Sequence, residues 1–271
     1  MLEALPTSGL PGLALGEVIG VFLQFLFAML RIGSFLIAAP LFSARFVPLQ
    51  VRIMMAVCLT LPLMVAAPLP TLGSLEGARI AIFVFRELAL GLAAGLLLQI
   101  LFAAAVIAGD RIANTAGLGL AAQVDPTTGT QSPIIGQFFT LFLIAIFLSL
   151  DGHLVAIRII IGSYSLIPIT APLQGEALSE MGRDAAGVMF RTAAQIMMPV
   201  VSILLILNAI IGVITRSAPQ LNIFAFGFPL TMSATILLLF LTTTSTGYAF
   251  ASLVEDTLTR LATMFEDARD G

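Results

Sequence analysis

The sequence contains no lysine and no tryptophan, and it has only one cysteine and one histidine in 271 residues. Cys58 lies in an apolar run, so a disulfide framework and a cysteine metal cluster are excluded. His153 alone cannot supply the ligand sets of common zinc or haem sites. All twelve basic residues are arginines and they form no basic patch, which argues against nucleic acid. We therefore expect no metal, no cofactor and no nucleic-acid partner.

What remains is a strongly apolar chain. Hydrophobic residues make up 59% of it, charged residues 10%, and the mean hydropathy is +1.09. This composition is typical of a polytopic membrane protein, so the expected fold class is an all-α integral membrane protein. The first seventeen residues carry Glu3 and Glu17 and no basic residue, and we expect no cleaved signal peptide there.

About six hydrophobic segments can be counted, and several contain prolines that kink or end a helix. We expect kinked helical hairpins with both termini on the cytoplasmic side, because arginines then favour that side. For the polar tail we favour a solvated helix over one that lies on a membrane surface or a partner. The segments are Val18–Phe42, which is either one long span with Arg31 inside or two short ones, Ile53–Leu75, Leu88–Gly109, Ile134–Leu150, Thr192–Thr215 and the stretch from about Pro229, with a seventh possible at Ile159–Gly175.

A polar break, Gly109–Pro133, separates two of the most apolar runs. Glycines give its backbone freedom, and Asp125 before Pro126 favours a turn. Unpaired backbone groups cannot face hydrocarbon, so this loop must lie in water, inside protein or along a wet cavity. It is either a gate or binding loop or a plain connection between helices, and composition alone favours the plain connection.

Four charged residues are candidates for burial inside the apolar segments: Glu17, Arg31, Arg86 and Glu87. An arginine in mid-span costs about 3 kcal/mol, so Arg31 needs water or a counter-ion, and Glu17 and Glu87 are the candidates. A snorkelling or purely structural pair is the alternative. Arg86 and Glu87 are adjacent and therefore point to different sides of a helix, toward different partners.

The sequence supports an enzyme poorly. It holds no Ser/His/Asp spacing, no His-Glu-x-x-His, no phosphate-binding Gly-Lys pair and no paired carboxylates at a site. Asp151 and His153 suggest a proton relay, but they flank Gly152 at the expected end of a span, where a capped turn is the reading we favour.

Taken together and in order, several motifs resemble the FliR/SctT family of type III export proteins. They are Arg45-Phe-Val-Pro48 to Arg52, Arg86-Glu-Leu-Ala-Leu-Gly91, Ala108-Gly-Asp110 through Gly117-Leu-Gly119 to Asp125-Pro126, Gly152-His153 with Ser163 to Pro168, and Arg216-Ser-Ala-Pro219 to Pro229. Each piece is weak alone, whereas the ordered set, and the run APQLNIFAFGFPL above all, is specific. That last motif favours the flagellar branch over the virulence injectisome branch.

The resemblance implies a subunit of the flagellar export gate in the bacterial inner membrane and flagellar basal body. It implies assembly with FliP and FliQ, contact with FlhB and FlhA, and passage of unfolded flagellar proteins, with energy from a separate ATPase and the proton motive force. It further implies one domain, 1–271, resembling a FliP-like part (1–175, with a plug loop at 109–133) fused to a FliQ-like hairpin (176–254) and a tail (255–271).

Two sets of residues receive roles from the same resemblance. The plug maps to Gly117, Leu118, Gly119, Leu120, Gln123, Asp125 and Pro126, where Leu120 and Gln123 replace the large aromatics expected of relatives. A structural joint between hairpins maps to Arg216, Pro219, Gln220, Asn222 and Gly227.

Three other functions compete with this one. A secondary transporter of small solutes would need charges that converge near mid-bilayer, and only Arg31 and Glu17 qualify. An intramembrane enzyme lacks a nucleophile and base. The injectisome counterpart, SctT, would share the fold and differ in substrates.

Overall fold

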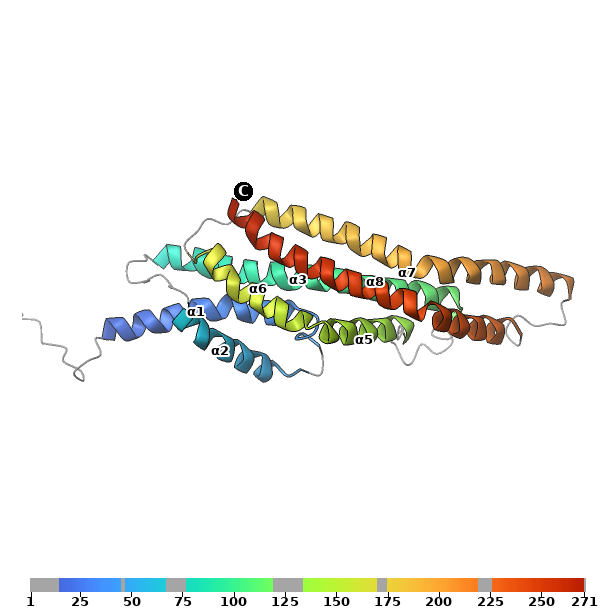
Figure 1. The fold of residues 1–271 in the computed structure, drawn as a ribbon, viewed down its shortest axis with the longest axis horizontal. Coiled ribbons are helices and arrows are strands. Elements are labelled where there is room, and N and C mark those ends of the chain that lie inside the picture. The colour runs from blue at the N-terminus through green and yellow to red at the C-terminus, as the bar shows by residue number, and fades with distance from the viewer. Residues whose placement is uncertain are drawn as a thin grey trace, which may run out of the picture. The chain divides into compact units, whose positions relative to one another are not determined.

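The protein is all-helical throughout the residues that the structure describes, which are 15–44, 47–66, 77–118, 134–169, 175–218 and 226–270 of this computed structural model (Figure 1). Within those ranges no strand occurs, so the all-α fold expected from composition is confirmed. The helices are α1 (Leu15–Ala38), α2 (Leu49–Ala66), α3 (Gly77–Thr115), α5 (Ile134–Ser149), α6 (Gly152–Leu166), α7 (Gly175–Ser217) and α8 (Phe228–Asp270).

Proline and one left-handed residue set the breaks between helices. Helix α1 runs through Arg31 as a single helix and ends just before Pro40, because the residue before a proline is pushed out of the helical region. Between α5 and α6 the chain bends by 68°, and Asp151 there has φ of 54°. Its carbonyl accepts the amides of Leu154 and Val155, which begins α6. Aspartate tolerates this conformation better than most side chains.

The number of spans differs from the six segments counted in the sequence. Four described helices are long and apolar enough to cross a membrane, and the bent pair α5–α6 makes a possible fifth. Helix α2 has 18 residues with Pro62 inside it, and its apolar part is too short to be counted. The apolar run from Ile159 is not a span of its own, because it continues α6, which begins at Gly152.

Helices α7 and α8 are longer than their apolar runs and have 43 residues each. At 1.5 Å per residue each extends for about 64 Å, about twice the hydrocarbon thickness. The polar stretch at 175–187, which precedes the expected apolar segment Thr192–Thr215, is the first part of α7. Arg260 of α8 joins Asp184 of α7 at 3.2 Å, so the polar ends of the two helices lie together.

The tail was also expected to be a solvated helix, and that expectation is wrong for its apolar face. Leu261, Met264 and Phe265 are buried at the end of α8. Their spacing of three and one residues places them on one side of a helix, so the same stripe that marked the tail as amphipathic is the side that packs.

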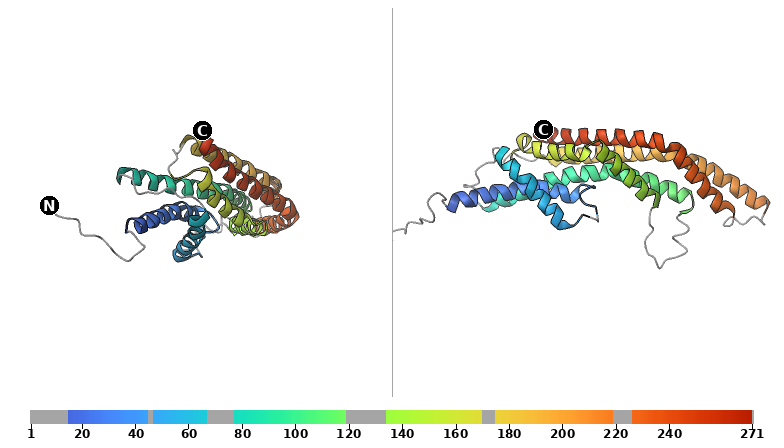
Figure 2. Two further views of the ribbon diagram at one scale, coloured as in Figure 1. Left: turned by 60° about the vertical axis from the view of Figure 1, so that its left-hand side comes forward. Right: turned by 60° about the horizontal axis from the view of Figure 1, so that its bottom comes forward.

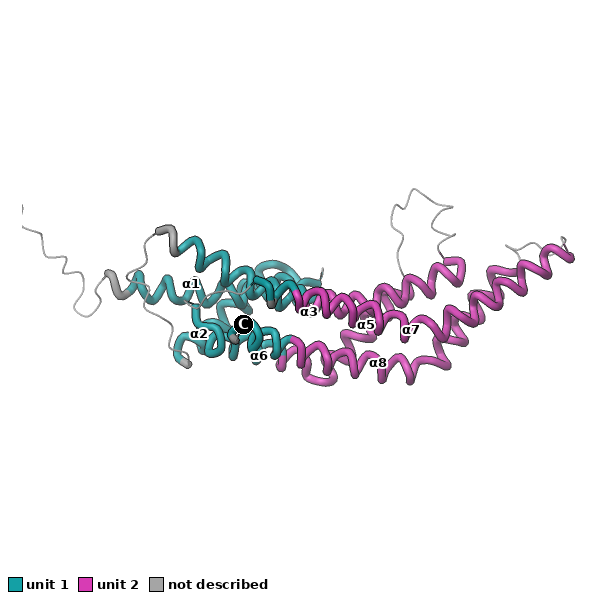
Figure 3. The backbone as a smooth tube through the Cα atoms, turned by 90° about the horizontal axis from the view of Figure 1, so that it is seen from above, with its two compact units in different colours: residues 1–96, 156–179, 261–271 teal, residues 97–155, 180–260 magenta. Residues whose placement is uncertain are grey.

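Contacts divide the chain into two compact units, coloured separately in Figure 3. Unit 1 holds residues 1–96, 156–179 and 261–271, and unit 2 holds 97–155 and 180–260. In unit 1, α1 and α2 pack against each other and lie side by side in both views of Figure 2.

Two pairs of helices approach closely at glycines. In unit 1 a Cβ at Gly91 of α3 would overlap the Arg31 carbonyl oxygen and the Ser34 hydroxyl of α1, and one at Gly95 would meet the Ala38 Cβ at 2.5 Å. In unit 2 a Cβ at Gly109 would lie 2.5 Å from the backbone of Gly136 in α5. Small residues at these positions let the helix backbones touch, which maximises packing where no hydrophobic force drives association.

The contact at Gly109 yields a stability prediction. Gly109→Ala should lower the melting midpoint of the detergent-extracted protein, because the added methyl meets backbone atoms that cannot rotate away. Gly212→Ala in α7 is the matched control: no atom lies within 4 Å of the added methyl, and alanine favours helices by about 1 kcal/mol. Equal midpoints for the two variants would contradict the close approach of α3 and α5.

Candidate functional site

The centre of unit 1 is a fully buried ion pair between α1 and α3. Arg31 Nε donates to Glu87 Oε2 at 2.8 Å and Arg31 Nη2 donates to Glu87 Oε1 at 2.9 Å, and both side chains are 0% exposed. This two-pronged geometry is the strongest arrangement available to an arginine and a carboxylate. Gly91 lies one turn after Glu87 on the same face of α3, and its missing side chain lets that face reach α1.

Helix α6 supplies the remaining partners of Arg31. Nη1 donates to the Ser163 hydroxyl at 2.9 Å, and Nη2 also donates to the Ile167 carbonyl at 3.0 Å. The guanidinium carbon lies 4.2 Å from the centroid of the Tyr164 ring, a cation–π contact. The Tyr164 hydroxyl in turn donates to the Ala28 carbonyl of α1. One arginine therefore ties three helices together.

Arg86 extends this polar centre to the residues that follow α6. Nη2 donates to the Pro168 carbonyl at 2.7 Å and Nη1 to the Ile169 carbonyl at 3.0 Å, while the buried Nε has no hydrogen-bond partner among the described residues. Although they are adjacent in the sequence, Glu87 binds Arg31 of α1, whereas Arg86 binds carbonyls that follow α6. Together with Arg31, Arg86 donates to the three successive carbonyl groups that follow the end of α6.

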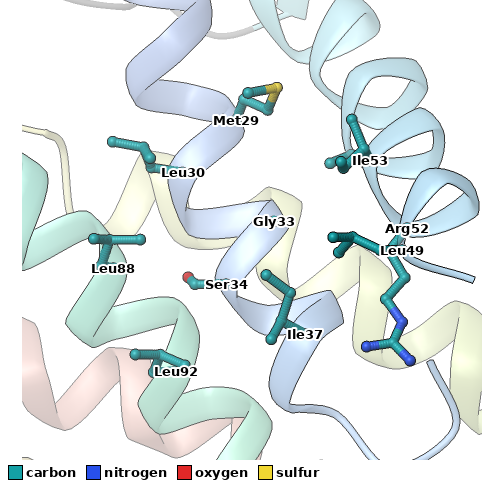
Figure 4. A pocket seen from close by; sticks show the side chains of 11 residues that line it. Met29, Leu30, Gly33, Ser34, Ile37, Leu49, Arg52, Ile53, Leu88 and Leu92 are labelled. Carbon is teal, nitrogen blue, oxygen red and sulfur yellow. The ribbon is translucent and has the colours of Figure 1, made fainter. Parts of the chain in front are cut away.

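An apolar groove of about 340 Å³ lies beside this centre, among α1, α2 and α3 of unit 1. Figure 4 shows Met29, Leu30 and Ile37 along one wall, Leu49 and Ile53 from α2, and Leu88 and Leu92 from α3. Arg52 borders it, but its Nη2 donates to the carbonyls of Ala44 and Val47 at the break between α1 and α2. The groove is therefore shaped for an apolar occupant.

The loop expected at 109–133 begins later than predicted, because α3 continues to Thr115. In unit 2 this C-terminal end of α3 is held from two other helices. Gly117 has φ of 86°, the left-handed conformation that glycine adopts after a helix end. Asn208 Nδ2 of α7 donates to the Thr115 carbonyl at 2.9 Å, and the Thr231 hydroxyl of α8 lies 3.2 Å from the Ala116 carbonyl. The ring of Phe228 would lie 3.5 Å from a Cβ at Gly117.

The family model described as "Bacterial export proteins, family 1" matches residues 22–257. The chain belongs to this family. The resemblance recognised from the ordered motifs is thereby confirmed, since the match covers all of them.

Curated relatives of this family 1 export protein carry the name flagellar biosynthetic protein FliR. That of Pectobacterium carotovorum subsp. carotovorum is 33% identical, with 80% of this chain and 82% of the relative covered. The Escherichia coli K12 protein is 31% identical over 78% of this chain and 80% of its own length. The Bacillus subtilis 168 protein is 31% identical, with coverages of 83% and 88%.

The structure brings together some of the residues singled out in this export protein and leaves others outside its described part. Arg31 pairs with Glu87, one of its two candidate counter-ions, and Arg86 lies beside them. In the loop, Gly117 and the half-buried Leu118 are described. At the joint, Arg216 is exposed and Gly227 is buried. The side chain of Glu17 is not described. The remaining candidates lie outside the described residues: Gly119, Leu120, Gln123, Asp125, Pro126, Pro219, Gln220 and Asn222.

Other polar residues of the site had not been assigned a role from the sequence. Four of them form side-chain hydrogen bonds with a residue more than ninety positions away in the sequence: Ser163 accepts one, and Tyr164, Asn208 and Thr231 each donate one. Asn208 was detectable as an amide inside a charge-free apolar run, where an unpaired amide is costly. The partner of Asn208 could not be detected from the sequence, because the acceptor is a backbone carbonyl and every residue has one.

The buried pair predicts an asymmetric response to neutralisation. Glu87→Gln should destabilise the protein by about 3–5 kcal/mol, because it leaves the fully buried Arg31 charge uncompensated. The measurement is the melting midpoint and the steady-state amount in membranes. Glu180→Gln is the matched control, since its 3.5 Å pair with Arg183 is exposed and exposed pairs contribute little. Similar behaviour of the two variants would refute a structural role for the pair.

Proposed function

We propose that this chain is a core subunit of the channel that passes unfolded flagellar proteins across the bacterial inner membrane. As a family 1 export protein it is a multi-pass inner-membrane component of the flagellar export apparatus. The observation that carries the finer proposal is the family match over residues 22–257, together with relatives named as flagellar along about four fifths of the chain. The injectisome role remains the alternative within the same fold.

We propose FliP and FliQ as the direct partners, with FlhB and FlhA also in contact. Large apolar side chains on α7 and α8 support this, because Ile206, Val213, Phe240 and Leu241 are all more than 60% exposed. Helices of about 64 Å cannot lie wholly inside a hydrocarbon layer of about 30 Å at ordinary tilts, so other subunits would cover part of that apolar surface. The groove of Figure 4 offers another apolar surface of the same kind.

The division of the chain into a FliP-like part at 1–175 and a FliQ-like hairpin at 176–254 is also proposed. Its support is local: α7 begins at Gly175, and its polar first turns pair with α8 through Arg260 and Asp184. We propose residues 117–126 as the plug, since Gly117 ends α3 in a conformation that starts a loop and glycine keeps the segment deformable.

The role proposed here is a passage and not catalysis. A closed channel for an unfolded chain must stop ions and still deform, and small apolar residues can do this by steric fill and dewetting. The small-solute transporter is disfavoured because Arg31, one of the two charges it would use, is wholly buried and binds Glu87 and the Ile167 carbonyl. The side chain of Glu17, the other, lies outside the description.

The proposal is tested by the composition of the extracted complex. Native mass measurement of the detergent-solubilised particle should give one mass that requires at least two other proteins, identified by peptide sequencing as FliP and FliQ. Disruption of the gene should abolish swimming, and the cloned gene should restore it. A monomer or small homo-oligomer as the sole species in membranes of swimming cells would overturn the gate assignment.

Gly117 provides the matching test of the plug. Gly117→Val should raise ion leak through the membrane or reduce export, since a side chain at φ of 86° costs about 1–2 kcal/mol and drives the loop start into another conformation. Gly117→Asn is the control, because asparagine tolerates left-handed backbone. Leak is followed by the loss of membrane potential, and export by swimming. Normal values of both in the valine variant would count against the plug.

A further inference from the structure

The apolar groove among α1, α2 and α3 is narrow. Along α1 its lining side chains run from Met29 to Ile37, which are eight positions, or about 12 Å of helix, apart. The groove holds about 340 Å³. A further helix about 10 Å across would need on the order of 900 Å³ over that length, so a helix can lie across the opening but cannot enter it. The groove instead fits a linear apolar chain.

A glycine gives the groove its depth. Gly33 of α1 faces Ala56 of α2, and a Cβ at Gly33 would lie 3.9 Å from the Ala56 Cβ. This is an ordinary contact, so position 33 has room for a methyl group, and a longer side chain would extend into the groove. Ser34 also lines the groove, but its hydroxyl donates to the Arg31 carbonyl at 3.1 Å. The occupant must therefore be apolar along the length of the groove.

One end of this apolar groove carries a positive charge. The guanidinium of Arg52 lies at the end opposite Met29 (Figure 4). Its Nη2 donates to two carbonyls at the break between α1 and α2, at 3.1 and 3.0 Å. No described residue accepts a hydrogen bond from Nη1, and no described carboxylate forms an ion pair with Arg52. The described part of the chain therefore leaves the charge of Arg52 for an anionic ligand.

This charge lies at the depth where lipid phosphates lie. Helix α1 is long and apolar enough to cross a membrane over Val18–Ala38, so the break that follows it lies at the membrane boundary. Arg52 binds carbonyls of that break, whereas Met29 lies well inside the span. The groove thus extends from the boundary toward the hydrocarbon. A phospholipid has the matching shape, since its phosphate lies at the boundary and its acyl chains extend inward.

We propose that the groove binds one acyl chain of an anionic phospholipid and that Arg52 binds the phosphate of the same lipid. Arginine suits this role, because its planar guanidinium can bind phosphate oxygens and keep its other hydrogen bonds. The lipid would join α2, whose apolar part is too short to count as a span, to α1 and α3. This role goes beyond the channel and does not depend on it, because it rests only on residues of unit 1 and on their place in a membrane.

The first test is lipid binding to the extracted complex. The detergent-solubilised particle is stripped of lipid and titrated with dioleoylphosphatidylglycerol, and bound lipids are counted by native mass. Gly33→Leu should weaken the tightest binding about tenfold, because the leucine side chain takes the place of several lipid methylene groups. Gly20→Leu is the matched control in the same helix, since no atom lies within 4 Å of a Cβ there. It should bind lipid as the unaltered complex does.

The second test concerns the headgroup. Arg52→Gln should weaken the binding of phosphatidylglycerol about tenfold and remove the preference for it over phosphatidylcholine. Arg158→Gln, which neutralises an exposed arginine of α6, should change neither. Unchanged affinity in either Gly33→Leu or Arg52→Gln overturns the proposal. Competition by glycerol phosphate, which has no acyl chain, would show a site for free phosphate and would overturn it as well.

Photolabelling of the unaltered complex does not require any variant to assemble. Phosphatidylglycerol with a diazirine in its acyl chain should label Leu30, Ile53 and Leu88 in the groove. Labelling of Val65, which is 91% exposed on α2 and lies outside the groove, should be weaker. Stronger labelling of Val65 would indicate contact with bulk lipid alone and overturn the proposal. If side chains of a partner subunit fill the groove, its residues should be labelled only after the complex is taken apart, and that result overturns the proposal too.

Discussion

The structure depends on one constraint: a chain this apolar has few donors to offer wherever a helix ends. Three breaks meet it in the same way, with a side chain from elsewhere satisfying the freed carbonyls. Arg31 and Arg86 serve the residues after α6, Arg52 serves the break between α1 and α2, and Asn208 with Thr231 serves the end of α3. Several polar residues inside the apolar runs therefore bind carbonyls at or just after helix ends, because an unpaired carbonyl there would cost more than the burial of its donor.

Close helix contact is the second half of that solution. A guanidinium can reach a carbonyl on another helix only if the backbones are near, and Gly91 and Gly95 bring α3 against α1 where Arg31 must meet Glu87. The same relation holds in unit 2, where the contact of Gly109 with Gly136 lies below the capped end of α3. The glycines and the buried polar groups therefore depend on each other, because the polar contacts form only where glycines let the helices come close.

The sequence predicted the helical class, the single helix through Arg31 as one of two options, and the family. It predicted less well where the helices end, because charge was taken as a boundary: the polar run at 175–187 belongs to α7. The tail is helical as expected, but its side chains Leu261 and Phe265 are buried and not solvated. The spacing of apolar and charged residues indicates which face of a helix is apolar, but it does not indicate what packs against that face. The partners of Arg86 and Asn208 were beyond reach for a different reason, since backbone carbonyls leave no mark in a sequence.

The use of arginine and not lysine at positions 31 and 86 follows from the same constraint. Arg31 binds both oxygens of Glu87, the Ser163 hydroxyl and the Ile167 carbonyl at once, and still places its flat face on Tyr164. A lysine ammonium has three donors and no planar group and is more strongly hydrated, so it could not replace this set of partners in a fully buried site. Arg86 bridges two successive carbonyls in the same manner. A buried cation that must bind several backbone carbonyls and stay charged is therefore best supplied by arginine, whose planar guanidinium has five N–H donors.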